Sequence, residues 1–214
     1  MILKSFSRYL AVLSFLAAVT GSCWAQSWDV SAAFKEGWPS KSNPYGVWSY
    51  GYSSGFTAPV TLYDRAEQNG VNGANAQFWF SSSVDLANSP SAEFNNGPAF
   101  DEGNLHLSAN EFTLVTGDGG HYSDVIFTAP IDGKYSLEGS FRGHHDGIGT
   151  VGGVVANGKV LFSCSITSDG QLVPFKRIAV LKAGTTVVFS VGPGPAASGG
   201  LQHTGLAAGF RLVN

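Results

Sequence analysis

The sequence predicts an all-β fold, an antiparallel β-sandwich, and three observations support this. Residues 134–141 alternate, with Tyr135, Leu137, Gly139 and Phe141 on one face and polar side chains on the other, which is typical of a half-buried strand. Asn157-Gly158 lies between two runs of β-branched and aromatic residues and predicts a two-residue hairpin. The chain also has 28 glycines among 214 residues and only 13% charged residues, a composition that suits a protein of strands and tight turns.

The stretch 127–191 contains the strongest of these signals. Pro130 and Gly133 bracket a turn before the alternating strand, because proline fixes φ and glycine tolerates positive φ. After the Asn157-Gly158 hairpin, residues 178–181 and 187–191 flank a second turn at Ala183-Gly184. Connections this short imply antiparallel pairing, since parallel strands need long crossovers.

The remaining elements are expected on both sides of this stretch. The strand candidates are residues 28–34, 47–52, 59–63, 77–80, 105–107, 111–115, 122–127 and 206–213. Residues 63–68 are expected to form one helical turn, and residues 81–101 a polar loop. Without an internal repeat or a linker, residues 26–214 are expected to form a single domain with about ten strands.

The first 25 residues have the pattern of a secretory signal peptide. Lys4 and Arg8 precede an apolar run over residues 10–19 that is too short to span a bilayer, and small residues lead to a cut after Ala25. Cleavage there removes two of the 12 basic residues and none of the 15 acidic ones, which leaves a net charge of −5. A secreted protein without a transmembrane segment is expected, and its acidity argues against nucleic acid as a partner.

Two alternatives to secretion into the medium remain open. Thr20-Gly21-Ser22-Cys23 resembles a lipobox, in which Cys23 would carry a lipid anchor. Retention in the periplasm is the second alternative. Cleavage after Ala25 leaves only Cys164, which cannot form an internal disulfide. Cys164 lies on the apolar phase of a strand, so an inert, buried thiol is expected.

Three segments together resemble a family of secreted bacterial β-sandwich proteins, often associated with PEP-CTERM sorting tails and mostly without assigned function. These segments are Asn43-Pro44-Tyr45-Gly46-Val47-Trp48-Ser49-Tyr50-Gly51, then Phe127-Thr128-Ala129-Pro130 with Gly133-Lys134-Tyr135, and Leu181-Lys182-Ala183-Gly184 with Phe189-Ser190-Val191-Gly192. The last two are also similar to the galactose-binding-like jelly rolls of carbohydrate-binding modules. The resemblance implies a jelly roll, and by analogy of fold a sugar ligand.

The sequence departs from this family at two places. It ends at Asn214 without a PEP-CTERM helix or basic tail, so sorting by that route is not expected. Where the family tends to have Asp-x-Thr-Gly-Leu, this chain has Gln202-His203-Thr204-Gly205-Leu206, and a cation role of that aspartate is not transferred.

The candidate ligand-binding residues are aromatic. Trp48, Tyr50 and Tyr52 share one face of a strand, and Trp38 and Trp79 lie elsewhere in the chain. Sugars stack their C–H faces on such rings, whereas the structural alternative is that the same face fills the core of a sandwich. Exposure of Trp38 and Trp79 distinguishes the two interpretations.

His144 and His145 are the other ligand-binding candidates, between Gly143 and Gly147. Adjacent residues of a strand point to opposite faces, so the pair could chelate a metal only from a loop, and a solvated loop is the simpler interpretation. Calcium is the one cofactor considered, with oxygen ligands from a few acidic side chains. These candidate metal ligands are Asp101, Glu102, Asp118 and Asp146.

No catalytic residues are assigned. Gly51-Tyr52-Ser53-Ser54-Gly55 matches the nucleophile-elbow pattern, but that motif needs a helix after the serine, and residues 56–60 do not start one. Glu93 and Glu102 fall in the polar region without recognisable spacing for glycoside hydrolysis. The expected function is a non-catalytic, carbohydrate-binding-like module that recognises a carbohydrate or cell-surface polysaccharide. A structural or adhesive protein and a hydrolase or lyase on the same scaffold are the alternatives.

Overall fold

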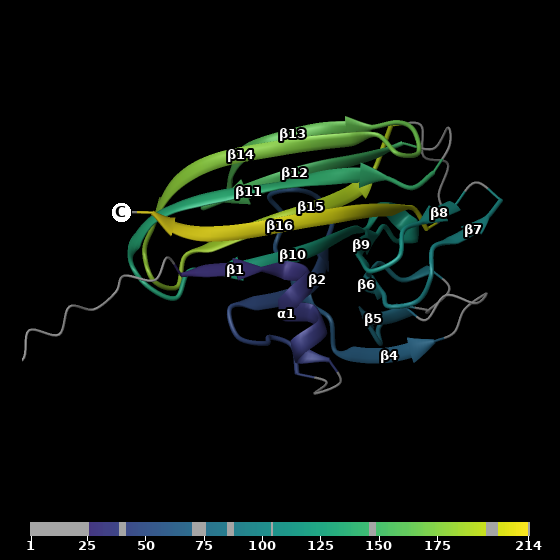
Figure 1. Cartoon of the computed structure of the whole chain (residues 1–214), viewed down its shortest axis with the longest axis horizontal. Coiled ribbons are helices and arrows are strands. Elements are labelled where there is room, and N and C mark those ends of the chain that lie inside the picture. Colours follow the sequence, from purple (N-terminus) through teal and green to yellow (C-terminus); the bar gives the residue numbers. More distant parts are fainter. Residues whose placement is uncertain are drawn as a thin grey trace, which may run out of the picture.

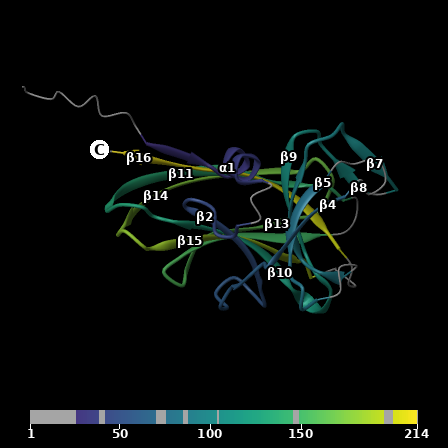
Figure 2. The same cartoon turned by 90° about the horizontal axis from the view of Figure 1, so that it is seen from below.

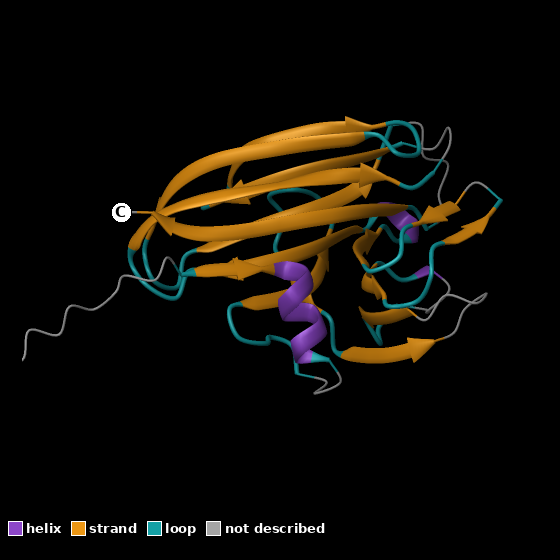
Figure 3. Ribbon diagram, in the orientation of Figure 1, coloured by secondary structure: helices purple, strands orange, loops and turns teal. Residues whose placement is uncertain are grey.

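The computed structural model describes residues 26–38, 42–69, 76–84, 88–103, 105–145, 149–195 and 201–213. Strands dominate this part of the chain, with α1 (Val30–Gly37) and a short 3₁₀ turn, η3 (Asp118–Gly120) (Figures 1 and 3). The strands are β1 (Ser27–Asp29), β2 (Trp48–Ser53), β3 (Thr61–Leu62), β4 (Arg65–Asn69), β5 (Ala76–Phe80), β6 (Ser91–Asn95), β7 (Phe100–Glu102), β8 (Leu105–Leu107), β9 (Glu111–Val115), β10 (Tyr122–Thr128), β11 (Gly133–Gly143), β12 (Thr150–Ala156), β13 (Lys159–Ile166), β14 (Leu172–Leu181), β15 (Thr186–Pro193) and β16 (His203–Val213). The predicted leader, residues 1–25, lies outside the described residues.

Two antiparallel sheets pack face to face, as Figure 2 shows. The larger sheet has the order β14-β11-β16-β9-β6-β5-β4, and β1 also pairs with β16; the smaller sheet has the order β13-β12-β15-β10-β2-β3. Strands β9, β10, β11 and β12 alternate between the two sheets, as in a jelly roll. The structure therefore confirms the all-β, antiparallel sandwich and has more strands than the predicted ten.

Aromatic side chains fill the space between the sheets. Trp48 of β2 packs against Phe127 of β10 with ring centroids 5.3 Å apart, and Phe127 stacks on Phe210 of β16 at 3.8 Å. All three are buried. Burial of one such side chain contributes about 1.5–3 kcal/mol, so this cluster is a main source of stability.

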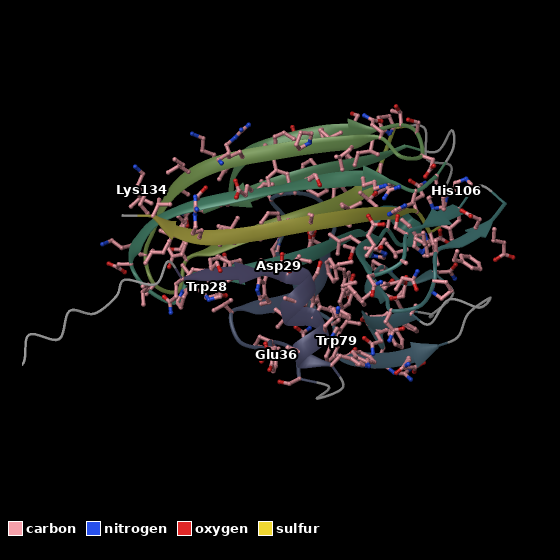
Figure 4. The ribbon with its side chains drawn as sticks, viewed as in Figure 1. Trp28, Asp29, Glu36, Trp79, His106 and Lys134 are labelled. Carbon is pink, nitrogen blue, oxygen red and sulfur yellow. The ribbon has the colours of Figure 1, made fainter. Side chains whose placement is uncertain are left out.

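The predicted strand over residues 28–34 is wrong beyond Asp29. The Asp29 carboxylate accepts a hydrogen bond from the Ala32 backbone N–H at 2.8 Å, which caps α1 at its N-terminus. Val30 and Phe34, four residues apart, face the core. Figure 4 shows Trp28 and Asp29 where β1 meets this helix.

Helix α1 completes one edge of β16. Strand β9 pairs with His203–Gly205 of β16, and β1 pairs with Gly209–Arg211 along the same edge, which leaves the middle of that edge without a strand partner among the described residues. The helix contacts β16, β6 and β9, so it covers this gap.

Two further predictions are wrong because pairing with distant strands decides the structure of these residues. Residues 65–69 form β4 rather than a helical turn, because they pair with β5 over their whole length. The predicted polar loop contains β6, which is hydrogen-bonded between β5 and β9. The Asn157-Gly158 hairpin is confirmed, with φ angles of 51° and 71° that match a type I′ turn. Local composition indicates turns well but cannot show long-range pairing.

The Asn-Pro-x-Gly motif connects three segments through one side chain. The Asn43 amide nitrogen donates to the carbonyls of Tyr50 at 2.7 Å and Tyr63 at 2.8 Å, and its oxygen accepts from the Tyr50 N–H at 2.9 Å. Asn43 therefore holds the turn against β2 and the segment that follows β3.

Candidate functional site

Four strands of the larger sheet bring polar side chains together on its outer face. Glu93 of β6 pairs with Thr113 of β9, Thr113 with Gly205 of β16, and Gly205 with Arg142 of β11. Opposite residues of antiparallel strands project on the same face. Because the flanking residues Phe94, Leu114, Leu206 and Phe141 belong to the core, this row faces away from it.

A cleft of about 340 Å³ opens on this outer face, and we call it the outer cleft. Its residues come from α1, β9, β11, β14, β16 and the turn before β9. The lining consists of Ser31, Ser108, Ala109, Asn110, Glu111, Phe112, Ser140, Arg142, Leu172, Gly205, Leu206 and Ala207. This volume lies at the lower end of the usual range for small-molecule sites, about 300–1,000 Å³.

Arg142 and Glu111 form the charged part of the outer cleft, and the buried His144 lies next to Glu111. The Arg142 guanidinium donates to the Ser108 hydroxyl at 2.7 Å and lies 4.0 Å from the Glu111 carboxylate. The His144 Nε2 atom lies 3.2 Å from the same carboxylate, without the alignment of an ordinary hydrogen bond. Burial raises the pKa of Glu111, but His144, Ser108 and Arg142 outweigh it, and the pKa ends below its usual value. Glu111 is therefore an anionic acceptor at neutral pH.

Gly205 makes this arrangement sterically possible. A Cβ atom on Gly205 would lie 2.2 Å from the Glu111 Oε1 atom and 2.9 Å from His144 Nε2. We expect Gly205→Ala to displace both side chains and to lower the free energy of unfolding by about 1–3 kcal/mol, as overpacking does. Denaturant unfolding measures this effect. The matched control is Gly209→Ala on the same strand, where the new Cβ would only reach ordinary contact at 3.4 Å; equal costs for the two variants would contradict the packing argument.

A second polar group lies beside the cleft and includes His203, which was not a candidate from the sequence. His203 Nδ1 lies 3.3 Å from His145 Nε2, and His203 Nε2 lies 3.7 Å from the Glu93 carboxylate. Burial lowers the pKa of His203 to about 3, with smaller contributions from His145 and His144. Burial also raises the pKa of Glu93, although the Ser91 hydroxyl donates to it at 2.6 Å. The distance between His203 and Glu93 is that of a loose ion pair, but burial favours the neutral form of both side chains.

Most of the aromatic candidates fill the core, which is the structural alternative that the sequence left open. Trp48 and Tyr50 are each 2% exposed and Trp79 is 5% exposed, because the strand face that carries them is the inner face of the sandwich. Trp38 is half-buried and packs edge-on against Trp79 at 6.3 Å between ring centroids. Tyr52 is also half-buried. The rings of Trp48, Tyr50 and Trp79 are thus core residues that cannot stack on a sugar at the surface.

The predicted histidine loop is buried rather than solvated. His144 is 0% exposed and His145 is 8% exposed. The β7–β8 hairpin packs there: the His106 N–H donates to the His144 carbonyl at 3.0 Å, and Leu105 bridges to His145. His106 is labelled on this hairpin in Figure 4. The two rings contact different partners, His144 the Glu111 carboxylate and His145 the His203 ring.

The proposed calcium ligands do not converge. Asp101 lies on β7 and contacts His106 at 3.0 Å, Glu102 is exposed on β7, and Asp118 belongs to η3. Asp146 lies outside the described residues. Within the described part of the chain, no three His, Cys, Asp or Glu side chains form a group that could hold a metal ion.

The residues considered for enzymatic chemistry have structural partners. Ser53 is buried and donates to the Gly55 carbonyl at 3.2 Å, and a turn rather than a helix follows it. Glu93 lies on β6 and not in a loop. Cys164 is half-buried, and burial raises the pKa of its thiol, which disfavours the reactive thiolate.

Glu111 and Arg142, the charged residues of the outer cleft, were not among the candidates from the sequence. One signal pointed to Arg142, because it continues the polar phase of the strand after Lys134, Ser136, Glu138 and Ser140. No comparable signal pointed to Glu111, since its position beside Arg142 depends on the pairing of β9 with β16.

Comparison with known proteins gives only structural likeness. No protein-family model matches the chain, and no curated protein matches it. The resemblance to the secreted bacterial family therefore stays a prediction. Among the described helices, none has the length and apolar character needed to cross a membrane.

Several solved structures with similarity to this chain are carbohydrate-binding modules. A family 35 carbohydrate binding module from Clostridium thermocellum is 15% identical, with 68% of this chain and 95% of that chain covered and a TM-score of 0.31. A carbohydrate binding module from Cellvibrio mixtus lichenase 5A in complex with cellotriose is 13% identical, with 54% and 88% covered and a TM-score of 0.31. The K1 cleaved adhesin domain of Lys-gingipain from Porphyromonas gingivalis W83 is 13% identical, with 89% and 99% covered and a TM-score of 0.32. At these scores the likenesses carry no argument about the site, and the fold class rests on the strand pairings of the chain itself.

Proposed function

We propose that this protein is a secreted, non-catalytic β-sandwich that binds carbohydrate in the outer cleft. The observation that carries the proposal is the set of polar groups in the cleft. The cleft has a volume of about 340 Å³. It is lined by the Arg142 guanidinium, the anionic Glu111 carboxylate and three serines, Ser31, Ser108 and Ser140. The predicted leader over residues 1–25 supports secretion.

The chemistry of these groups suits sugar hydroxyls. Each sugar hydroxyl donates one hydrogen bond and accepts others, so a site that offers both donors and acceptors can satisfy neighbouring hydroxyls together. Arg142 supplies fixed donors, and Glu111 supplies an acceptor. Hydrogen bonds to such charged groups are about twice as strong as those between neutral groups. Because Glu111 offsets the charge of Arg142, a neutral sugar fits the cleft better than an anionic one.

The same lining argues against hydrolysis. Glycoside hydrolysis uses two carboxyl groups on either side of the scissile bond. Glu111 is the one carboxylate among the described residues that line the outer cleft. Binding without cleavage is the function that this set of side chains supports best.

The test is a glycan array and polysaccharide pull-down with the purified protein, its Arg142→Met and Glu111→Gln variants, and Lys134→Met as a matched control. Lys134 lies on the outer face of the same strand, eight residues from Arg142 and outside the cleft. We expect each cleft variant to weaken binding about 10- to 100-fold, because each loses hydrogen bonds to a charged group. Lys134→Met should bind as the wild type does.

Two results would contradict the proposal: no binding by the folded wild type to the glycans tested, or full binding by both cleft variants. No binding would favour the second candidate, a structural or adhesive extracellular protein without a small ligand, whereas full binding by both variants would move the sugar site away from the outer cleft. The observation behind that candidate is that Trp48, Tyr50 and Trp79 serve the core.

A further inference from the structure

A buried carboxylate, that of Asp124, lies on the outer face of the smaller sheet and does not line the outer cleft. Asp124 of β10 is 1% exposed and pairs with Gly51 of β2 on one side and Ser190 of β15 on the other. Its neighbour Val125 belongs to the core between the sheets. Since successive residues of a strand alternate in direction, the Asp124 side chain points away from that core.

Residues 54–61, which we call the strap, lie against this face. A Cβ atom on Gly51 would lie 2.4 Å from the Thr61 carbonyl oxygen, and one on Gly153 would lie 2.6 Å from the Phe56 ring. Gly51 pairs with Asp124, and Gly153 pairs with Ser190. The strap therefore packs directly onto both glycines that flank the Asp124–Ser190 pair.

The oxygen atoms under the strap lack partners. Neither carboxylate oxygen of Asp124 accepts a hydrogen bond of ordinary geometry from a described residue, and the hydroxyl of Ser190, which is fully buried, has no such bond either. Burial raises the pKa of Asp124 to about 6, and the nearby hydroxyls of Ser190 and Ser53 only partly offset it. No described basic side chain contributes to this shift.

We propose that Asp124, Ser190 and Ser53 form a buried binding site for a hard metal cation beneath the strap. Buried polar atoms are normally paired, so the two carboxylate oxygens of Asp124 and the Ser190 hydroxyl call for a missing partner. Ser53 already donates to the Gly55 carbonyl, and its oxygen would join the site as a further ligand. Carboxylate and hydroxyl oxygens are ligands that hard cations such as Ca²⁺ and Na⁺ accept. A cation would also supply the positive charge that no described side chain provides there. The site lies on the opposite sheet from the outer cleft, so it is independent of sugar binding.

The experiment is thermal unfolding of the purified protein after removal of metals, at pH 7.5 and constant ionic strength. Ca²⁺, Mg²⁺, Na⁺ or K⁺ is added alone, with choline as the replacement cation. We expect one of these cations to raise Tm by about 5–10 °C at one hundred times its Kd. The shift should shrink at pH 5, because a proton competes for the carboxylate.

Asp124→Asn should abolish the cation-dependent shift, and Ser190→Ala should reduce it. The matched control is Asp101→Asn, an exposed acid on β7, which should keep the full shift. If Asp124→Asn does not fold, Ser190→Ala alone decides. No shift in the wild type with any of the four cations, or an undiminished shift in the deciding variant, would overturn the proposal.

Discussion

Lowering the pH from 7 to 4.5 is expected to remove about 2–3 kcal/mol of the stability of this protein through His203 alone. Burial lowers the pKa of this histidine in the folded state from 6.5 to about 3. Below pH 6.5 the unfolded chain therefore binds a proton that the folded protein does not. The corresponding stability is complete above the unfolded pKa and decreases steadily as the pH falls toward the folded pKa.

Urea unfolding at pH 7.0, 6.0, 5.0 and 4.5 tests this expectation. His203→Gln should lose less stability than the wild type over that range, because glutamine does not titrate. Glu93→Gln provides a control of opposite sign: burial raises the pKa of Glu93, so its contribution is lost as the pH rises, and its removal should steepen the acid loss. Equal pH dependence in His203→Gln and wild type would refute the assignment.

Asn43→Ala is expected to lower the free energy of unfolding by about 2–4 kcal/mol, because three hydrogen bonds disappear and the Tyr50 N–H and the Tyr63 carbonyl lose their bond to Asn43. The Tyr50 carbonyl still accepts from the Tyr63 N–H. Denaturant unfolding at pH 7 gives the change in unfolding free energy directly. Asn43→Asp should cost at least as much as Asn43→Ala, because it keeps the acceptor for the Tyr50 N–H but places a second acceptor oxygen against the carbonyls of Tyr50 and Tyr63.

Asn96→Ala is the matched control for this change, since Asn96 is an exposed asparagine just after β6. Its cost is expected to stay within about 0.5 kcal/mol, as for most surface substitutions. A cost for Asn43→Ala no larger than that of the control would show that the motif does not hold the segments together.

The parts of the fold that depend on neighbouring residues were predictable from sequence. The Asn157-Gly158 turn needs two positive φ angles, and asparagine followed by glycine supplies them locally. The start of α1 was missed although its signals are also local: Asp29 is a good N-cap, and Val30 and Phe34 have helical spacing. Strands β4 and β6 could not be recognised, because their polar sequences form strands only through their partners.

The candidate site was harder to predict than the fold. Glu93, Thr113, Gly205 and Arg142 share one row only because four strands pair in a particular register. No spacing in the sequence encodes that juxtaposition. The aromatic residues drew attention instead, yet the strand alternation that grouped Trp48 with Tyr50 cannot tell an inner face from an outer one.

The pairing of β1 with β16 sets the order in which the molecule can assemble. Ser27 pairs with Arg211, so the first described strand and the last one close the same sheet. During synthesis the ribosome would release the partner of β1 last, and the larger sheet would stay open until then. Contacts of such long range slow folding, and a chain that folds late stays extended for longer. If residues 1–25 direct export, this delay would favour a chain that crosses the membrane unfolded and closes its sandwich only on the far side.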